Sequence, residues 1–350
     1  MFTTVSILAR IYRNTIFFMN QSLPIKRIAW IDLLRGFCMM CILWFHTEMH
    51  FCGHEITPYS LYVGNVLAVF FFLSGYLFYS QKPVNIRYKL YRILRSLVIP
   101  YFIFSTLMAL PKAFIHHESI DIISIAQEIL LGKASWFVPA LIVAELLFIA
   151  ILCIPKRRNM FIIILSILIL FLSFLIGNRF NPSPLLYSYN IWHINEALLG
   201  CSFIAFGYMY HHIENIINTK RNIYMMTLLL IAVMIVKYMV LTTCTDMVFG
   251  PIIVSNYPLF IIDLILTTIL LVNIFQFLPN CKIIQWTGSH CLVYYFICGA
   301  IPLLTSKLLH TIGVYSNNYI MILMVFLLVY LIATMITWII YKYFHWIVGR

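Results

Sequence analysis

Apolar stretches long enough to cross a bilayer recur along almost the whole of this 350-residue chain. A spanning helix needs about 20 mostly apolar residues, because in lipid every backbone polar group must be hydrogen-bonded within the helix. Only 10% of the residues are charged and 63% are hydrophobic, whereas ordinary soluble domains carry about 25% charged residues. This balance excludes soluble, disordered and disulfide-stapled secreted proteins, and it indicates an integral membrane protein.

The hydrophobic segments predict an all-α, polytopic membrane helix bundle with about ten transmembrane helices. The predicted spans lie near 28–50, 57–80, 89–111, 136–154, 160–178, 191–211, 222–243, 257–278, 286–309 and 317–342. They leave no room for a soluble domain, so residues 27–350 are expected to form a single transmembrane domain. Residues 1–26 contain no apolar run of signal-peptide length. They are expected to form a cytoplasmic N-terminal segment that is either interfacial or dispensable, since Met19 is an alternative start.

Lysine and arginine residues predict the orientation of the spans, because cytoplasmic loops carry an excess of positive charge. If the N-terminus is inside, 18 of the 23 basic residues fall on the cytoplasmic side, four fall outside, and Lys237 lies within a span. Both termini are therefore expected to be cytoplasmic. Nucleic acid is not an expected partner, since its binding needs a basic face on a soluble fold rather than short scattered clusters.

The first predicted span carries ionisable side chains where lipid disfavours them, which usually indicates a function. At 100° per residue, Asp32, Arg35, His46 and His50 share an arc of about 60° on one helix face. Arg35 and His46 are separated by about 16 Å along the helix axis. A cation and an imidazole at this spacing suit an extended acyl thioester, with phosphates near Arg35 and the thioester near His46. Histidine is the usual general base for deprotonating an acceptor hydroxyl.

A purely structural interpretation of the same residues stays open. Asp32 and Arg35 would then form an ion pair that anchors the helix, and His46 would be a hydrogen-bonded interior group. No metal is expected, because His46 and His50 are four residues apart but no third ligand follows at helical spacing.

Several motifs of the first half of the chain resemble the family-3 membrane acyltransferases. The stretch Asp32-Leu33-Leu34-Arg35-Gly36, followed by ten residues and His46, is similar to the signature of that family. Three further matches follow in order: Phe70 to Tyr76 (Phe-Phe-Phe-Leu-Ser-Gly-Tyr), the basic group Lys89, Arg92 and Arg95 with Pro100 and Tyr101, and Trp136 to Leu141 (Trp-Phe-Val-Pro-Ala-Leu). The resemblance covers about residues 27–145 well, and the later spans match mainly in hydropathy.

This resemblance implies an O-acyltransferase, most often an O-acetyltransferase, that acts on sugars of bacterial surface glycans or their precursors. It implies acetyl-CoA as the acyl donor and co-substrate, and a multi-pass location in the bacterial inner (cytoplasmic) membrane. The expected partners are acyl-CoA, a carbohydrate acceptor, membrane lipid and other glycan-assembly proteins. Cys298 departs from the family pattern, since many members carry a His at this position. No role of that His is therefore carried over to this chain.

The expected catalytic residues are His46 as the base, Asp32, which would orient Arg35, and Glu145. Glu145 would orient His46 or contact acceptor hydroxyls, or it would be a protonated, hydrogen-bonded group, an alternative that also applies to Glu196 and Asp263. Arg35, Arg92 and Arg95 are expected to bind the phosphates of CoA, because guanidinium groups hold phosphate with paired hydrogen bonds. Ser74-Gly75 is expected to allow close approach of two helices.

A transporter or a flippase for a lipid-linked glycan is the alternative function, with the same charges lining a translocation path. Such proteins often contain inverted repeats, and the motif-bearing first half of this chain has no counterpart in the second half. A purely structural scaffold is a third option, and it explains a stripe of Asp, Arg and His on one helix face poorly.

Overall fold

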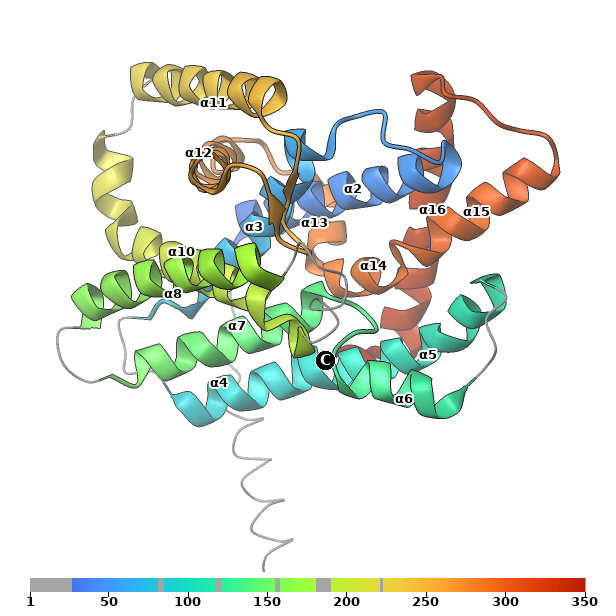
Figure 1. Ribbon diagram of the computed structural model, residues 1–350, viewed down its shortest axis with the longest axis horizontal. Coiled ribbons are helices and arrows are strands. Elements are labelled where there is room, and N and C mark those ends of the chain that lie inside the picture. Colours follow the sequence, from blue (N-terminus) through green and yellow to red (C-terminus); the bar gives the residue numbers. More distant parts are fainter. Residues whose placement is uncertain are drawn as a thin grey trace, which may run out of the picture.

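The computed structural model describes residues 27–80, 85–116, 121–154, 158–180, 190–220 and 223–349. The expected N-terminal segment, residues 1–26, lies outside these ranges. Helices dominate the described part of the chain (Figure 1). The first half contains α2 (Ala29–Phe51), α3 (Tyr59–Phe78), α4 (Ile86–Ile93), the π-helix η1 (Leu94–Val98), α5 (Ile99–His116), α6 (Ile122–Leu130), α7 (Phe137–Leu152) and α8 (Arg158–Phe180).

The second half continues with helices and one short hairpin. Its elements are η2 (Ile191–His193), α10 (Ile194–Lys220), α11 (Ile223–Thr243), β1 (Met247–Val248), β2 (Ile253–Val254), α12 (Tyr257–Phe275), α13 (Lys282–Ser289), α14 (Cys291–Ile297), α15 (Ala300–Thr311), α16 (Tyr319–Tyr343) and η3 (His345–Val348). The strands β1 and β2 pair antiparallel, with Met247 opposite Val254. The prediction of an all-α polytopic membrane bundle is confirmed, and the structure adds this hairpin to it.

Each of the ten predicted spans coincides with helical structure. Seven helices of the described residues are long and apolar enough to cross a membrane, including the continuous run Ile86–Ala109 formed by α4, η1 and α5. The span predicted at 286–309 is broken, because α14 and α15 bend by 46° between Ile297 and Ala300. The remaining two spans correspond to α7, which has only 16 residues, and to α10, which has 27 residues but carries polar groups along its length.

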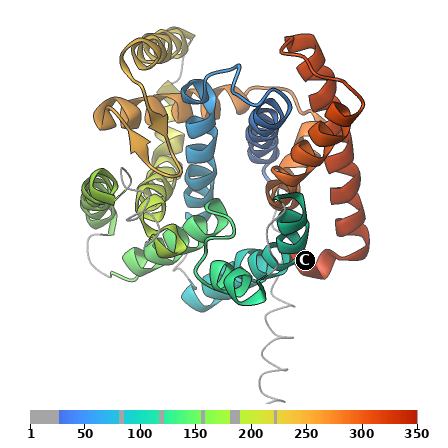
Figure 2. The same cartoon turned by 45° about the vertical axis from the view of Figure 1, so that its right-hand side comes forward.

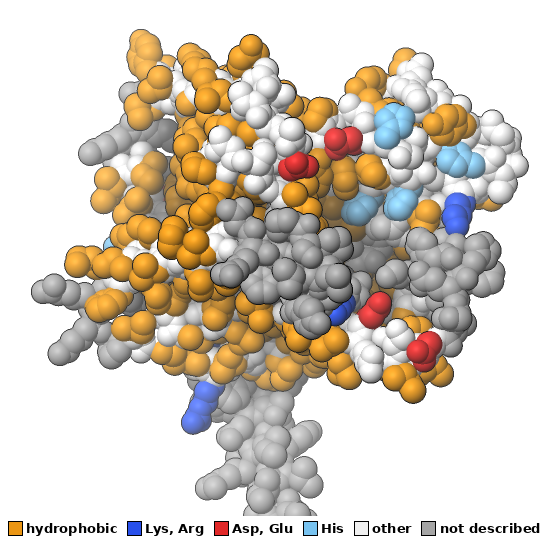
Figure 3. All heavy atoms as spheres, in the orientation of Figure 1, with side chains coloured by type: hydrophobic (Ala, Val, Ile, Leu, Met, Phe, Trp, Pro, Cys, Tyr) orange, Lys and Arg blue, Asp and Glu red, His pale blue; other side chains and the backbone are white. Residues whose placement is uncertain are grey.

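Hydrophobic side chains cover much of the outer surface (Figure 3). On α8, α11 and α16, residues such as Ile167, Leu228 and Leu331 are more than half exposed. A soluble monomer rarely presents apolar surface on this scale. These helix faces are therefore the ones that lipid would cover.

The helix that carries the polar stripe lies near the centre of the bundle, where α2 packs against α3, α13, α15 and α16 (Figures 1 and 2). Two glycines bring α2 and α13 into backbone contact. A Cβ on Gly288 would overlap the carbonyl oxygen of Asp32, and one on Gly36 would overlap that of Ile284. Small residues thus allow α13 to cross α2 directly beside Asp32.

The close approach predicted for Ser74-Gly75 is present between α3 and α10. A Cβ on Gly75 would overlap the carbonyl oxygen of Ile204, and one on Gly207 would overlap that of Phe72. The sequence interpretation of this pair as a packing element is therefore confirmed at Gly75.

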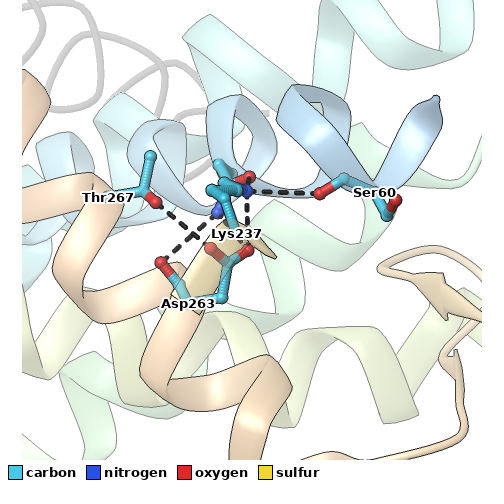
Figure 4. A network of polar contacts seen from close by, with 5 residues as sticks. Ser60, Lys237, Asp263 and Thr267 are labelled. Atoms are coloured by element: carbon cyan, nitrogen blue, oxygen red, sulfur yellow. Dashed lines mark hydrogen bonds and ion pairs between the residues drawn. The ribbon is translucent and has the colours of Figure 1, made fainter. Parts of the chain in front are cut away.

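The buried side chain of Lys237 joins the helices α11, α12 and α3 (Figure 4). The Nζ atom of Lys237 in α11 lies 2.8 Å from Oδ2 of Asp263 in α12. It also donates to Oδ1 of Asn65 at 2.6 Å and to the carbonyl oxygen of Ser60 at 3.2 Å, both in α3. Asn65 donates in turn to Asp263 Oδ2 at 2.9 Å. Because every partner here is polar, the network compensates a charge that lipid would otherwise disfavour. Asp263 therefore has a structural partner.

Candidate active site

Two cavities lie end to end along α2. The first, of about 860 Å³, follows the N-terminal half of the helix, and we call it the basic cavity. The second, of about 730 Å³, follows the C-terminal half and is lined by His46, and we call it the His46 cavity. The predicted stripe runs through both, since Asp32 and Arg35 line the basic cavity and His46 lines the other. Three members of the predicted stripe therefore face these cavities, whereas His50, the fourth, lines neither of them.

Cations dominate the basic cavity. Five basic residues line it, against the two carboxylates Asp32 and Glu145. The basic residues are Arg27, Arg35, Lys89, Arg92 and Arg95. The three arginines proposed from the sequence as phosphate ligands therefore meet in one cavity, although Arg35 comes from a different helix than the other two. An excess of guanidinium groups in one cavity is suited to a ligand with several phosphates.

A local distortion lies where the arginines enter the bundle. Arg92 is in the last turn of α4 and Arg95 is in the π-helical turn η1 that follows. Such turns inside α-helices are frequent at functional sites. Arg92 is exposed at the surface and Arg95 is half-buried. The cations thus extend from the surface into the cavity.

The carboxylates of the basic cavity have partners of their own. Asp32 Oδ2 lies 4.0 Å from Nη1 of Arg27. The hydroxyl of Ser74 in α3 donates a hydrogen bond to Oε1 of Glu145 in α7. No sequence pattern indicated this pair, because 71 residues separate the two side chains. Ser74 therefore has both a packing neighbour in Gly75 and a half-buried carboxylate beside it.

The three residues expected to act in catalysis do not meet in one cavity. Asp32 and Glu145 line the basic cavity, and neither of them lines the His46 cavity. The expectation that Glu145 orients His46 has no geometric support here. Glu145 lies instead with the cations and with Ser74.

The His46 cavity combines aromatic rings with hydrogen-bonding groups. His46 is half-buried, and its ring is roughly parallel to that of His50, with centroids 6.2 Å apart. The aromatic residues that line the cavity are Phe45, Tyr59, Trp136 and Tyr295, and its titratable residues other than His46 and these tyrosines are His54, Glu55, Asp246 and Cys298. In Figure 3, histidine side chains gather over the region of α2, with acidic side chains beside them. Such a mixture is suited to a ligand with both hydroxyl groups and apolar faces.

Two buried carboxylates that do not line this cavity accept hydrogen bonds from the segments around it. Glu48 is fully buried and accepts hydrogen bonds of 2.7 Å from Trp44 Nε1 and from Thr57 Oγ1. It thereby fixes the turn that carries His54 and Glu55. Glu196 is also fully buried and accepts a hydrogen bond from Ile252 N in the β1–β2 hairpin. Both carboxylates stabilise loops, so the sequence alternative of a hydrogen-bonded structural role fits Glu196.

Tyr295 of α14 lies where the two cavities meet. Among the described residues, only Ile42 and Tyr295 line both cavities. The backbone N–H of Phe137, the first residue of α7, donates to the Tyr295 hydroxyl at 3.1 Å. Cys298, the departure from the family pattern, follows three residues later and lines the His46 cavity. No sequence motif singled out Tyr295. The one signal available was its position three residues before Cys298.

Comparison with known proteins identifies one family. The family-3 model, described as an acyltransferase domain, matches residues 28–342. No curated protein and no solved structure matches the chain. The matched segment contains all six residues proposed from the sequence as catalytic or donor-binding, His46 among them. Of the residues that line the two cavities, it leaves out only Arg27, Val348 and Gly349.

Proposed function

This chain belongs to the family-3 acyltransferases, and from that premise we propose that it is a membrane O-acetyltransferase. Its donor would be acetyl-CoA, and its acceptor a sugar hydroxyl of a cell-surface glycan or glycan precursor. One observation carries the proposal: the polar face of α2 presents Arg35 to a basic cavity and His46 to a second cavity, and the two cavities meet at Ile42 and Tyr295.

The basic cavity supports the assignment of an acyl-CoA donor. CoA carries its phosphates at one end and its thioester at the other, so its binding needs cations at a distance from the reacting group. Arg35, Arg92 and Arg95 would hold the phosphates, with charge-assisted hydrogen bonds. Asp32 and Glu145 would position these cations. The pantetheine arm would then extend along α2 through the roughly 16 Å that separate Arg35 from His46.

His46 would supply the proton transfer. Its neutral imidazole accepts the proton of the acceptor hydroxyl while the hydroxyl oxygen attacks the thioester carbonyl carbon. A carbon–oxygen bond forms, the carbon–sulfur bond breaks, and CoA leaves as a thiolate. The imidazolium then returns the proton to the departing sulfur, which regenerates neutral His46 and leaves an acetyl ester on the acceptor. No metal is required for this sequence of steps.

The lining of the His46 cavity favours a carbohydrate acceptor. Carboxylates such as Glu55 and Asp246 accept hydrogen bonds from hydroxyl groups. The rings of Tyr59 and Trp136 offer flat apolar surfaces for the face of a sugar ring. These residues come from three separate segments of the chain, which together would enclose one sugar unit beside His46.

The positive-inside pattern would orient the basic cavity toward the cytoplasm, where acyl-CoA is available. From the family resemblance we propose the bacterial inner membrane as the location, with the acceptor supplied by other glycan-assembly proteins. Family membership makes acyl transfer a better explanation of the polar stripe than the alternative of a transporter or flippase.

Radiolabelled acetyl-CoA tests the proposal directly. Purified protein in detergent is incubated with the labelled donor and a cell-envelope fraction as the source of acceptor. Release of free CoA together with labelled glycan is expected, and at donor concentrations below KM both should fall by about tenfold or more in His46→Ala and in Arg35→Ala. Retention of glycan acetylation in both variants would overturn the assignment. Binding of a lipid-linked glycan without CoA release would favour the transport alternative.

A further inference from the structure

The junction of the two cavities is formed by side chains that have little freedom to move. The Tyr295 ring is half-buried, and its hydroxyl accepts the hydrogen bond from Phe137 N. That N–H lies in the first turn of α7, where backbone donors lack partners within the helix. The Phe137 ring lies 5.4 Å from the Tyr295 ring and 5.7 Å from that of Phe70, measured between centroids. Tyr295 is thus held at both its hydroxyl and its ring.

The backbone around Tyr295 is held as well. The thiol of Cys298 lies 3.0 Å from the Tyr295 carbonyl oxygen. The next residue, Phe296, stacks on Phe104 of α5 with ring centroids 4.7 Å apart and an interplanar angle of 9°. From the other side, Ile42 of α2 is 6% exposed and shares the junction. A fixed aromatic ring therefore stands between the cavity with the cations and the cavity with His46.

We propose that Tyr295 is the residue that determines which acyl groups the enzyme accepts. The inference rests on the proposed function, because it takes the basic cavity as the donor site. A thioester that reaches the junction presents its acyl group to the Tyr295 ring. A methyl group fits against this ring, whereas each additional methylene must displace it or enter the space of the acceptor. Tyr295 thereby restricts the donor to short acyl groups.

Donor competition measures this restriction. Initial rates of CoA release are recorded with acetyl-, butyryl- and hexanoyl-CoA, with a cell-envelope fraction as the acceptor source. In Tyr295→Ala, the ratio of kcat/KM for hexanoyl-CoA to that for acetyl-CoA should rise by about tenfold or more, as expected when a pocket gains room for methylene groups. Ile42→Ala, which opens the same junction from α2, should shift the ratio in the same direction.

Two features of the design separate selectivity from folding. The ratio compares two donors on one preparation, so it does not depend on the fraction of active protein. Tyr295→Leu removes the ring but keeps apolar bulk, and it carries the test if the alanine variant does not fold. Tyr295→Phe retains the ring and should keep the wild-type ratio.

Failure of the inference and failure of the proposed function give different results. An unchanged donor ratio in both Tyr295→Ala and Tyr295→Leu, with acetyl transfer intact in the wild type, would overturn the role of Tyr295 alone. Wild-type protein that releases no CoA from any of the three donors would overturn the proposed function, and this inference with it.

Discussion

Arg35 and His46 lie on one face of α2, about three turns apart, and line two different cavities. A single helix therefore fixes the distance between the cation of one cavity and the imidazole of the other. Since α2 packs against α3, α13, α15 and α16, this distance is set by a rigid element at the centre of the bundle. An extended substrate could bind at Arg35 and react near His46 without any change in the helix.

Removing the imidazole of His46 tests its role as the base. In His46→Ala we expect kcat for acetyl transfer to fall by about 10²- to 10⁴-fold, because general acid–base catalysis contributes on this scale. The KM for acetyl-CoA should change little, since the basic cavity remains intact. His50→Ala is the matched control: His50 lies one turn further along α2 and lines neither cavity. Wild-type kcat in His46→Ala would rule out the proposed base.

The basic cavity predicts a different kinetic pattern. Arg35→Ala, Arg92→Ala and Arg95→Ala should each raise the KM for acetyl-CoA by about 10- to 100-fold, because a hydrogen bond to a charged group contributes about 1.5–3 kcal/mol. Arg87→Ala is the control, since Arg87 is an exposed residue of the same helix as Arg92 but does not line the cavity. If Arg87→Ala weakened the donor as much as the other three, the cavity would not be the phosphate site.

The contact between α2 and α13 makes Gly288 intolerant of a side chain. We expect Gly288→Val to destabilise the protein by about 1–3 kcal/mol, because overpacking at a close backbone contact forces the helices apart. Gly299→Ala is the control, since a Cβ there would meet nothing within 4 Å. Thermal unfolding in detergent compares the two variants. Equal Tm values would contradict the close approach.

The buried ion pair of Lys237 and Asp263 predicts strong coupling between two substitutions. Lys237→Met should destabilise the protein by about 3–5 kcal/mol, because it leaves Asp263 as a buried charge without its cation. The double variant Lys237→Met/Asp263→Leu should recover most of this loss, since apolar pairs often replace buried ion pairs at little cost. Thermal unfolding of the two variants measures the coupling. A double variant that is no more stable than Lys237→Met would show that the pair is not the source of the effect.

The hydrophobic spans and the stripe on the first helix could be predicted without any tertiary information. Hydropathy over about 20 residues and the 100° turn of a helix are local properties, so they can be read from consecutive residues. For this reason Asp32, Arg35 and His46 were placed on one face, and all ten spans correspond to helices. The break between α14 and α15 was not predicted, because the apolar pattern continues across it.

Contacts between distant segments required the tertiary structure. The sequence left open whether Glu145 orients His46, contacts acceptor hydroxyls or is a hydrogen-bonded group, and the structure places it beside Ser74 and the cations of the basic cavity. Lys237 and Asp263 were recognised as charges within spans, but their pairing depends on how α11 and α12 pack. Tyr295 carried no signal of its own as a junction residue, since it becomes one only when α14 lies against α2 and α7.

Hydropathy and charge along the chain are enough to identify a membrane helix bundle with a polar stripe on its first helix, because lipid tolerates few other structures and few misplaced charges. The packing of the helices is what gives this stripe two cavities and puts Tyr295 between them. Which helices touch depends on close backbone contacts such as that of Gly36 with Ile284, and these form between residues far apart in the chain. No local pattern of hydropathy encodes such contacts.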